Sequence, residues 1–277
     1  MKISVTVSQQ HNGVSIRDYL EQQGYSTTQI KRFKYNGTIT VNGTPVTVRC
    51  VLKTGDVLQL TSNERLATPS FASCKAEIMF ADEYMYVANK PYGVAIHPDR
   101  AHRAETFGNM LAATFDNGFQ LHIVTRLDKT TSGLVLGALD EITAQKLNDM
   151  QSGHLIQKCY VAEVEGIVEK NVDVIELPLA RLDGQNKTVV DCKAGKPSTT
   201  KYEVIARRKN TTLMKVQPLT GRTHQIRAHL AAIGHPIVGD TLYGAQKAQR
   251  IKLHCQTLCF IHPYTGNIVE VTAPADF

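Results

Sequence analysis

Over the first 62 residues, the apolar and polar positions form two helical patterns, and two runs of β-branched residues come after them. Ser15 can cap a first helix that ends at Gly24, and a second helix is expected to begin at Thr27 or the next residue. Asn-Gly pairs flank the first β-branched run, and Gly-Asp precedes the second. The pattern predicts a small α/β module of two helices followed by strands at residues 38–41 and 57–60.

From residue 76 onward the chain contains many apolar runs with few helical patterns between them. Residues 63–75 are small and polar, so they are expected to link two domains, residues 1–62 and 76–277. The run 134–139 is apolar and predicts a buried strand. Consecutive strands with few helices predict an α+β fold with a largely antiparallel, mixed sheet. The expected strands are 78–80, 85–89, 134–139, 158–164, 201–206, 212–217, 258–261 and 268–271.

Three helices are expected among these strands, at residues 106–113, 140–150 and 223–233. Asp140 can cap the second helix, and a glycine follows both the second and the third. Their expected apolar faces are formed by Ile142, Leu147 and Met150 in the second helix, and by Ile226, Leu230 and Ile233 in the third.

Charge and cysteine content narrow the class of protein. The formal net charge is +6 and the pI is about 8.9, which favours a polyanionic partner moderately. No apolar run approaches the roughly 18 to 20 residues that cross a bilayer, and residues 1–7 lack a signal-peptide core. The six cysteines are scattered without a Cys-x-x-Cys pair, which favours reduced thiols. A monomeric cytoplasmic protein without membrane contact is therefore expected.

Asp128 lies in the stretch with the clearest chemical content. It follows Arg126-Leu127 and precedes a small polar run that ends at Gly133, directly before the buried strand. Asp128 is thus expected on a loop held by a rigid element, where reactive groups often lie. Residues 125–134 resemble the signature loop of the RluA-like pseudouridine synthases, His-Arg-Leu-Asp-x-x-Thr-Ser-Gly-Leu. Thr125 stands where that family usually has His.

Three further stretches resemble the same family, in the family's order. Residues 221–230, together with Gly239-Asp240-x-x-Tyr243-Gly244, resemble its second signature. Residues 158–160 resemble its Lys-x-Tyr segment, and residues 89–98 resemble its entry strand and turn. The resemblance covers roughly residues 75 to 275.

The resemblance implies an isomerase that converts uridine in structured RNA into pseudouridine. No cofactor is expected because the reaction involves no redox change and no net hydrolysis, and no metal is expected. It implies Asp128 as the catalytic carboxylate, Tyr160 against the target base and Arg222 as a catalytic arginine. The sequence leaves open whether Asp128 attacks the sugar or the base, or abstracts a ribose proton. Ribosomal RNA is favoured over transfer RNA as the substrate, and neither the RNA nor the uridine is specified.

The chemistry of these residue types agrees with those roles. A carboxylate can add to a carbon centre and later leave, as in glycosidases that form covalent intermediates. In a closed pocket it needs a cation to stay ionised, and a guanidinium can hold it through two parallel bonds. Arg222 directly precedes the third helix and is the predicted partner. Tyr160 offers a face for stacking and a hydroxyl for a polar contact.

RNA contact is expected at two places. The N-terminal module resembles the α-L RNA-binding module shared with a small-subunit ribosomal protein. Lys31, Arg32 and Lys34 would lie along its second helix and bind phosphates, or they would form only a solvated face. Arg126 can fill the gap that a flipped uridine leaves in the stack, or it can bind a phosphate.

Two alternatives are weighed against this interpretation. The first is a non-catalytic RNA-binding factor, for example in ribosome assembly, that retains the fold; the set of Asp128, Tyr160 and Arg222 argues against it, and Thr125 keeps it open. The second is a zinc site at residues 254–262, whose His and Cys spacing fits no usual zinc pattern. Lys90 and His97 are expected to shape the pocket wall rather than to react.

Overall fold

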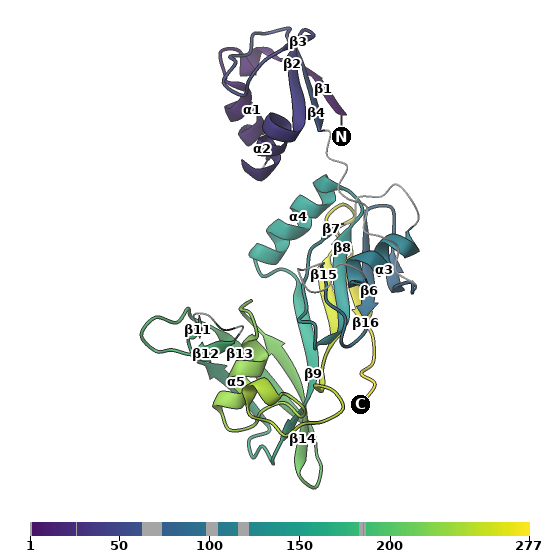
Figure 1. The fold of residues 1–277 in the computed structure, drawn as a ribbon, viewed down its shortest axis with the longest axis vertical. Helices are drawn as coiled ribbons and strands as arrows, with labels where there is room; N and C mark the ends of the chain where they lie inside the picture. Colours follow the sequence, from purple (N-terminus) through teal and green to yellow (C-terminus); the bar gives the residue numbers. More distant parts are fainter. Residues whose placement is uncertain are drawn as a thin grey trace. The chain divides into compact units, whose positions relative to one another are not determined.

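The computed structural model describes residues 2–25, 27–62, 74–97, 105–115, 122–182, 185 and 187–277. Its internal contacts divide the chain into two compact units, Met1–Thr68 and Pro69–Phe277 (Figure 1). Most of the predicted linker, residues 63–73, lies outside the described residues. No helix in the described parts of the chain is both long and apolar enough to cross a membrane.

The N-terminal unit packs two helices on a four-stranded sheet of order β1-β4-β2-β3. Ser15 caps the first helix because its hydroxyl oxygen accepts the Asp18 N–H, as predicted. Ile16, Leu20 and Phe33 from the helices are buried against strand residues such as Leu58. The first strand was not predicted from the sequence. The elements are β1 (Lys2–Thr6), η1 (Gln9–His11), α1 (Ile16–Gln22), α2 (Thr27–Asn36), β2 (Gly37–Val41), β3 (Thr44–Pro45) and β4 (Val57–Ser62).

The second unit is built on one large mixed sheet, which confirms the predicted α+β fold. Its strand order is β10-β13-β14-β9-β15-β8-β6-β5, with β16 added to β15 and β7 added to β8. All of these pairs are antiparallel except β15 with β8, and β11 pairs separately with β12. The strands are β5 (Glu77–Ala81), β6 (Met85–Lys90), β7 (His122–Ile123), β8 (Ser132–Ala138), β9 (Gln157–Glu165), β10 (Val172–Glu176), β11 (Leu179–Arg181), β12 (Thr188–Val190), β13 (Thr199–Arg207), β14 (Thr211–Pro218), β15 (Leu253–Ile261) and β16 (Ile268–Thr272).

The helices of this unit are α3 (Phe107–Thr114), α4 (Glu141–Ser152) and α5 (Gln225–Ala232), and a short turn, η2, spans Thr241–Tyr243. Asp140 caps α4 by accepting the Thr143 N–H at 2.8 Å, as expected. The predicted apolar face of α4 is partly wrong, because Ile142 is 68% exposed while Thr143, Ala144 and Leu147 are buried. Helical spacing alone could not separate the two sides of a helix with so few apolar residues.

Strand β8 is central because both of its faces are covered. Leu134 and Leu136 pack into the core that includes Leu147 of α4, whereas Val135 packs with Phe107 and Leu111 of α3. Figure 1 shows α4 and α3 on opposite sides of this strand. All seven residues of β8 are buried, as the apolar run predicted. The loop that precedes β8 is therefore attached to a strand that is buried on both faces.

Candidate active site

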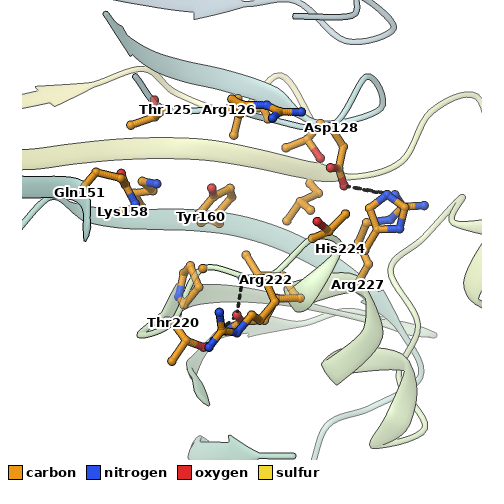
Figure 2. A pocket seen from close by; sticks show the side chains of 18 of the residues that line it. Thr125, Arg126, Asp128, Gln151, Lys158, Tyr160, Thr220, Arg222, His224 and Arg227 are labelled. Atoms are coloured by element: carbon orange, nitrogen blue, oxygen red, sulfur yellow. Dashed lines mark hydrogen bonds and ion pairs between the residues drawn. The ribbon is translucent and has the colours of Figure 1, made fainter. Parts of the chain in front are cut away.

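A cleft of about 390 Å³ opens between this loop and the start of α5, within the size range of small-ligand sites (Figure 2). Loop residues 124–128 and Thr131 line one side, and residues 220–227 line another. Tyr160 and Lys158 project into it from β9, and Gln151 closes it from the end of α4. The sequence-predicted residues Arg126, Asp128, Tyr160 and Arg222 all line this one cleft.

Backbone contacts fix the loop that carries Asp128. The Thr125 hydroxyl oxygen accepts the Leu136 N–H at 2.8 Å, and the Asp128 carbonyl accepts the Thr131 N–H at 3.0 Å. Gly133 has φ +112°, and a Cβ there would lie 2.3 Å from the Cys255 carbonyl oxygen, so only glycine lets β8 approach β15 this closely. Thr125 lines the cleft but is only 2% exposed, and its hydroxyl is bonded to the backbone of β8. Thr125, which stands where the family usually has His, thus stabilises the loop that carries Asp128.

Lys90 supports the same loop from behind. Its side chain is fully buried, and its ammonium donates to the carbonyls of Pro91 and Val94 at 2.8 and 2.9 Å. A longer contact of 3.4 Å reaches the carbonyl of Lys129, the residue after Asp128. Burial lowers the pKa of Lys90 to about 7, although the charge of Asp128 raises it in part. Lys90 lies behind the residues that line the cleft, and it ties the turn after β6 to the reactive loop.

Arg227 is the guanidinium that pairs with Asp128. Its Nη1 lies 3.2 Å from Asp128 Oδ2, while Nε and Nη2 hold Asp240 in a bidentate pair at 2.6 and 2.9 Å. Burial disfavours the charged form of Arg227 and so lowers its pKa. The hydrogen bonds and charges of Asp240 and Asp128 outweigh burial, so the pKa of Arg227 is raised. The Asp128 side chain is 28% exposed and that of Arg227 is 6% exposed. A fixed positive charge therefore faces a carboxylate that remains open to the cleft.

The predicted pairing of Asp128 with Arg222 is wrong. Arg222 is exposed in the segment before α5, and its backbone N–H donates to Gln225 Oε1 at 3.0 Å. Figure 2 shows the contact between Asp128 and Arg227, with Arg222 set apart from both. Helical spacing did not single out Arg227, because six consecutive residues of α5, from Gln225 to Leu230, are buried.

Tyr160 forms part of the floor of the cleft. It is 7% exposed on β9, opposite Cys255 of β15. Burial raises its pKa well above the ordinary tyrosine value, so the phenol keeps its proton. Lys158 lies two residues earlier on the same face of the strand, and burial lowers its pKa. The cleft therefore combines an aromatic floor with a basic wall.

His224 also faces Asp128, although no role was predicted for this residue from the sequence. Its Nε2 lies 3.6 Å from Asp128 Oδ2, and its Nδ1 lies 3.2 Å from the hydroxyl of Tyr243. Burial lowers the pKa of His224 below its ordinary value, although Asp128 opposes this in part. No motif identified this residue as reactive, because the contact depends on the backbone conformation at the start of α5.

The other basic residues predicted to contact RNA lie at two places, on the rim of the cleft and on α2 of the N-terminal unit. Arg126 is exposed on the rim of the cleft, and its charge adds to the effect of burial in lowering the pKa of His97. Lys31 and Lys34 are exposed on α2 in the other unit, and the side chain of Arg32 lies outside the described residues. Across the described ranges, no three His, Cys, Asp or Glu side chains gather as they would around a metal ion.

The fold and the cleft define an enzyme that presents an arginine-paired carboxylate, an aromatic floor and a basic rim to its substrate. Residues 84–232 match the RNA pseudouridylate synthase family. The chain belongs to this family, so it is an isomerase that acts on RNA. The family resemblance predicted from the sequence is confirmed.

Named relatives cover most of the chain. The dual-specificity RNA pseudouridine synthase RluA of Vibrio cholerae is 37% identical over 207 residues, which is 73% of this chain and 83% of the relative. The ribosomal large subunit pseudouridine synthase C of Pasteurella multocida is 31% identical over 294 residues, 98% of this chain and 90% of the relative. The solved human RNA pseudouridylate synthase domain containing 1 superposes with a TM-score of 0.63 at 26% identity, covering 77% of this chain and 87% of that one.

Proposed function

We propose that this enzyme isomerises specific uridines of ribosomal RNA, and that Asp128 is the carboxylate that reacts with the flipped nucleotide. The observation that carries the proposal is the Asp128–Arg227–Asp240 contact. It places a carboxylate oxygen, paired with a buried guanidinium, beside a cleft that could take a single nucleoside. In this proposal no cofactor takes part, because isomerisation changes neither the oxidation state nor the composition of the nucleoside.

Other residues of the cleft would hold the nucleotide. The face of Tyr160 would support the uracil ring from the floor of the cleft. Arg126 on the rim would occupy the gap that the flipped base leaves, and flipping costs a few kcal/mol in the RNA. Arg222 is exposed and has no carboxylate partner among the described residues, so we assign it to an RNA phosphate.

Ribosomal RNA is the proposed substrate because several relatives that match most of the chain are named as synthases of the large ribosomal subunit. The relative RluA is named as having dual specificity, so transfer RNA is the second candidate. The N-terminal unit would add affinity through Lys31, Arg32 and Lys34 on α2. We also propose that the protein works as a monomer, and that it works in the cytoplasm, where ribosomes are assembled in bacteria.

The proposal is tested with purified protein and unmodified transcripts of large-subunit ribosomal RNA and of transfer RNAs. Pseudouridines are then mapped chemically in both pools. We expect new pseudouridine at discrete positions of the ribosomal transcript, and none with the Asp128→Asn variant, which keeps the size of the side chain. Modification of transfer RNA alone would contradict the assigned substrate, and activity of Asp128→Asn within about tenfold of the parent, against the 100-fold or larger losses typical of a missing catalytic group, would contradict the role of Asp128.

A further inference from the structure

Isomerisation of uridine requires a base that acts on the ring as well as a carboxylate, and this inference rests on the proposed function. When C5 has joined the ribose, it still carries its hydrogen, and the ring holds a C6=N1 double bond. The C5 proton must leave before the product is complete. A group with a free lone pair in the cleft is needed for that step.

His224 is held in an unusual backbone conformation that directs its ring toward the cleft. Its φ is +53°, in the left-handed region that few side chains adopt, and it is the N-cap residue directly before α5. Its side chain makes no capping bond to the helix, although this is the usual task of a polar residue at that position. The imidazole lies in the cleft instead, with Nε2 at 3.6 Å from Asp128 Oδ2.

The hydrogen bonds of Tyr243 fix which nitrogen of His224 carries the proton. The Tyr243 hydroxyl lies 2.9 Å from the Thr188 carbonyl oxygen, to which it donates, and it accepts the Thr188 N–H at 3.0 Å. Its single hydrogen is therefore in use, so the hydroxyl oxygen can only accept from His224 Nδ1 at 3.2 Å. Neutral His224 consequently carries its proton on Nδ1 and presents a bare lone pair at Nε2.

The surrounding charges allow this ring to be neutral at rest and to accept a proton. Burial, Arg227 and Arg181 of β11 lower the pKa of His224, whereas Asp128 and Asp240 raise it. A proton gained at Nε2 would face Asp128 directly. The other groups of the cleft suit the step less well, since Tyr160 keeps its proton and Asp128 is already paired with Arg227.

We propose that His224 Nε2 is the base that removes the C5 proton in the second half of the reaction. The Nε2 lone pair forms a bond to the hydrogen, and the C5–H electron pair becomes the C5=C6 double bond. The former C6=N1 pair moves to N1, which takes a proton from water. The imidazolium pairs with Asp128 and then returns its proton to water, so the enzyme is regenerated.

The test is a single-turnover measurement on the transcript that the parent modifies, made with either uridine or 5-deuterouridine. The variant is His224→Asn, because Asn tolerates the left-handed conformation and keeps a donor for Tyr243 while it lacks Nε2. We expect this variant to be slower by roughly 100-fold or more, the usual contribution of a general base, with a clear primary isotope effect from the C5 deuterium. His235→Asn, the same change at a histidine outside the cleft, should keep the parent rate.

Two outcomes would overturn the inference. A His224→Asn rate close to that of the parent would exclude a catalytic step at this residue. A slow variant with no isotope effect would mean that His224 only positions Asp128, because loss of a positioning residue does not make C5 deprotonation rate-limiting. A parent that forms no pseudouridine would instead overturn the proposed function itself.

A profile of rate against pH adds a check. The parent should lose rate as the pH falls through a His224 pKa lower than 6.5, and His224→Asn should lack this acidic decrease.

Discussion

Arg222 and Arg227 are two arginines of the same cleft, five residues apart, and they differ in burial and in the partners of their side chains. Arg227 is buried, held by both oxygens of Asp240 and directed at Asp128. Arg222 is exposed on the segment before the helix, and its backbone rather than its guanidinium contacts Gln225. An arginine fixed by a buried carboxylate can supply a charge at a defined place, whereas an exposed arginine can follow a mobile ligand. The partners of each guanidinium in the free protein therefore indicate its role. Arg227, which is held by carboxylates, has an electrostatic role, whereas exposed Arg222 has a role in RNA binding.

The largest expected effect follows from removing the fixed arginine. Arg227→Ala leaves Asp240, which is 1% exposed, without its bidentate partner, and breaking a buried pair in this way costs about 3–5 kcal/mol. We expect the free energy of unfolding, measured with denaturant, to fall by that amount, together with a loss of activity. A decrease below about 1 kcal/mol, as for exposed ion pairs, would mean that Arg227 is not the structural centre of the site.

The second effect concerns the loop that carries Asp128. Thr125→Val keeps the shape of the side chain but removes the oxygen that accepts the Leu136 N–H, and a buried donor left without a partner costs about 1–3 kcal/mol. The denaturation midpoint should fall accordingly, and the single-turnover rate should fall with it because Asp128 loses its fixed position. Thr125→Ser keeps the hydroxyl and serves as the matched control. Equal behaviour of the two variants would contradict a role for the hydroxyl.

The smallest effect is expected at Arg222. Arg222→Ala removes one phosphate contact, so the affinity for RNA should fall moderately. The slope of log affinity against log salt concentration should become shallower by roughly 0.7–0.9, the value for one phosphate contact. Stability should stay within about 0.5 kcal/mol of the parent, as for most exposed positions. Filter binding at several salt concentrations measures the slope, and an unchanged slope would remove Arg222 from the RNA interface.

Much of the fold follows from local patterns, and the reasons are visible in single elements. The apolar run of β8 predicted its burial, and the polar residues before α1 and α4 marked where these helices begin. The short strands β11 and β12, which pair with each other, were not predicted, because runs of three residues carry too little periodicity. The site shows the same division. Two separate motifs indicated Asp128 and Tyr160, which both line the cleft, but the partner of Asp128 depends on Asp240, which lies thirteen residues beyond Arg227 and across a turn.

The central claim is that Asp128 works with Arg227 and not with Arg222. The direct test compares the single-turnover rates of Arg227→Lys and Arg222→Lys at saturating RNA, since both variants keep the positive charge and lose the planar fork. We expect Arg227→Lys to be slower by about 100-fold or more, because a lysine cannot hold Asp240 and face Asp128 at the same time. Arg222→Lys should recover the parent rate once RNA is saturating. A loss at Arg222→Lys as large as that at Arg227→Lys, under the same saturating conditions, would contradict the account.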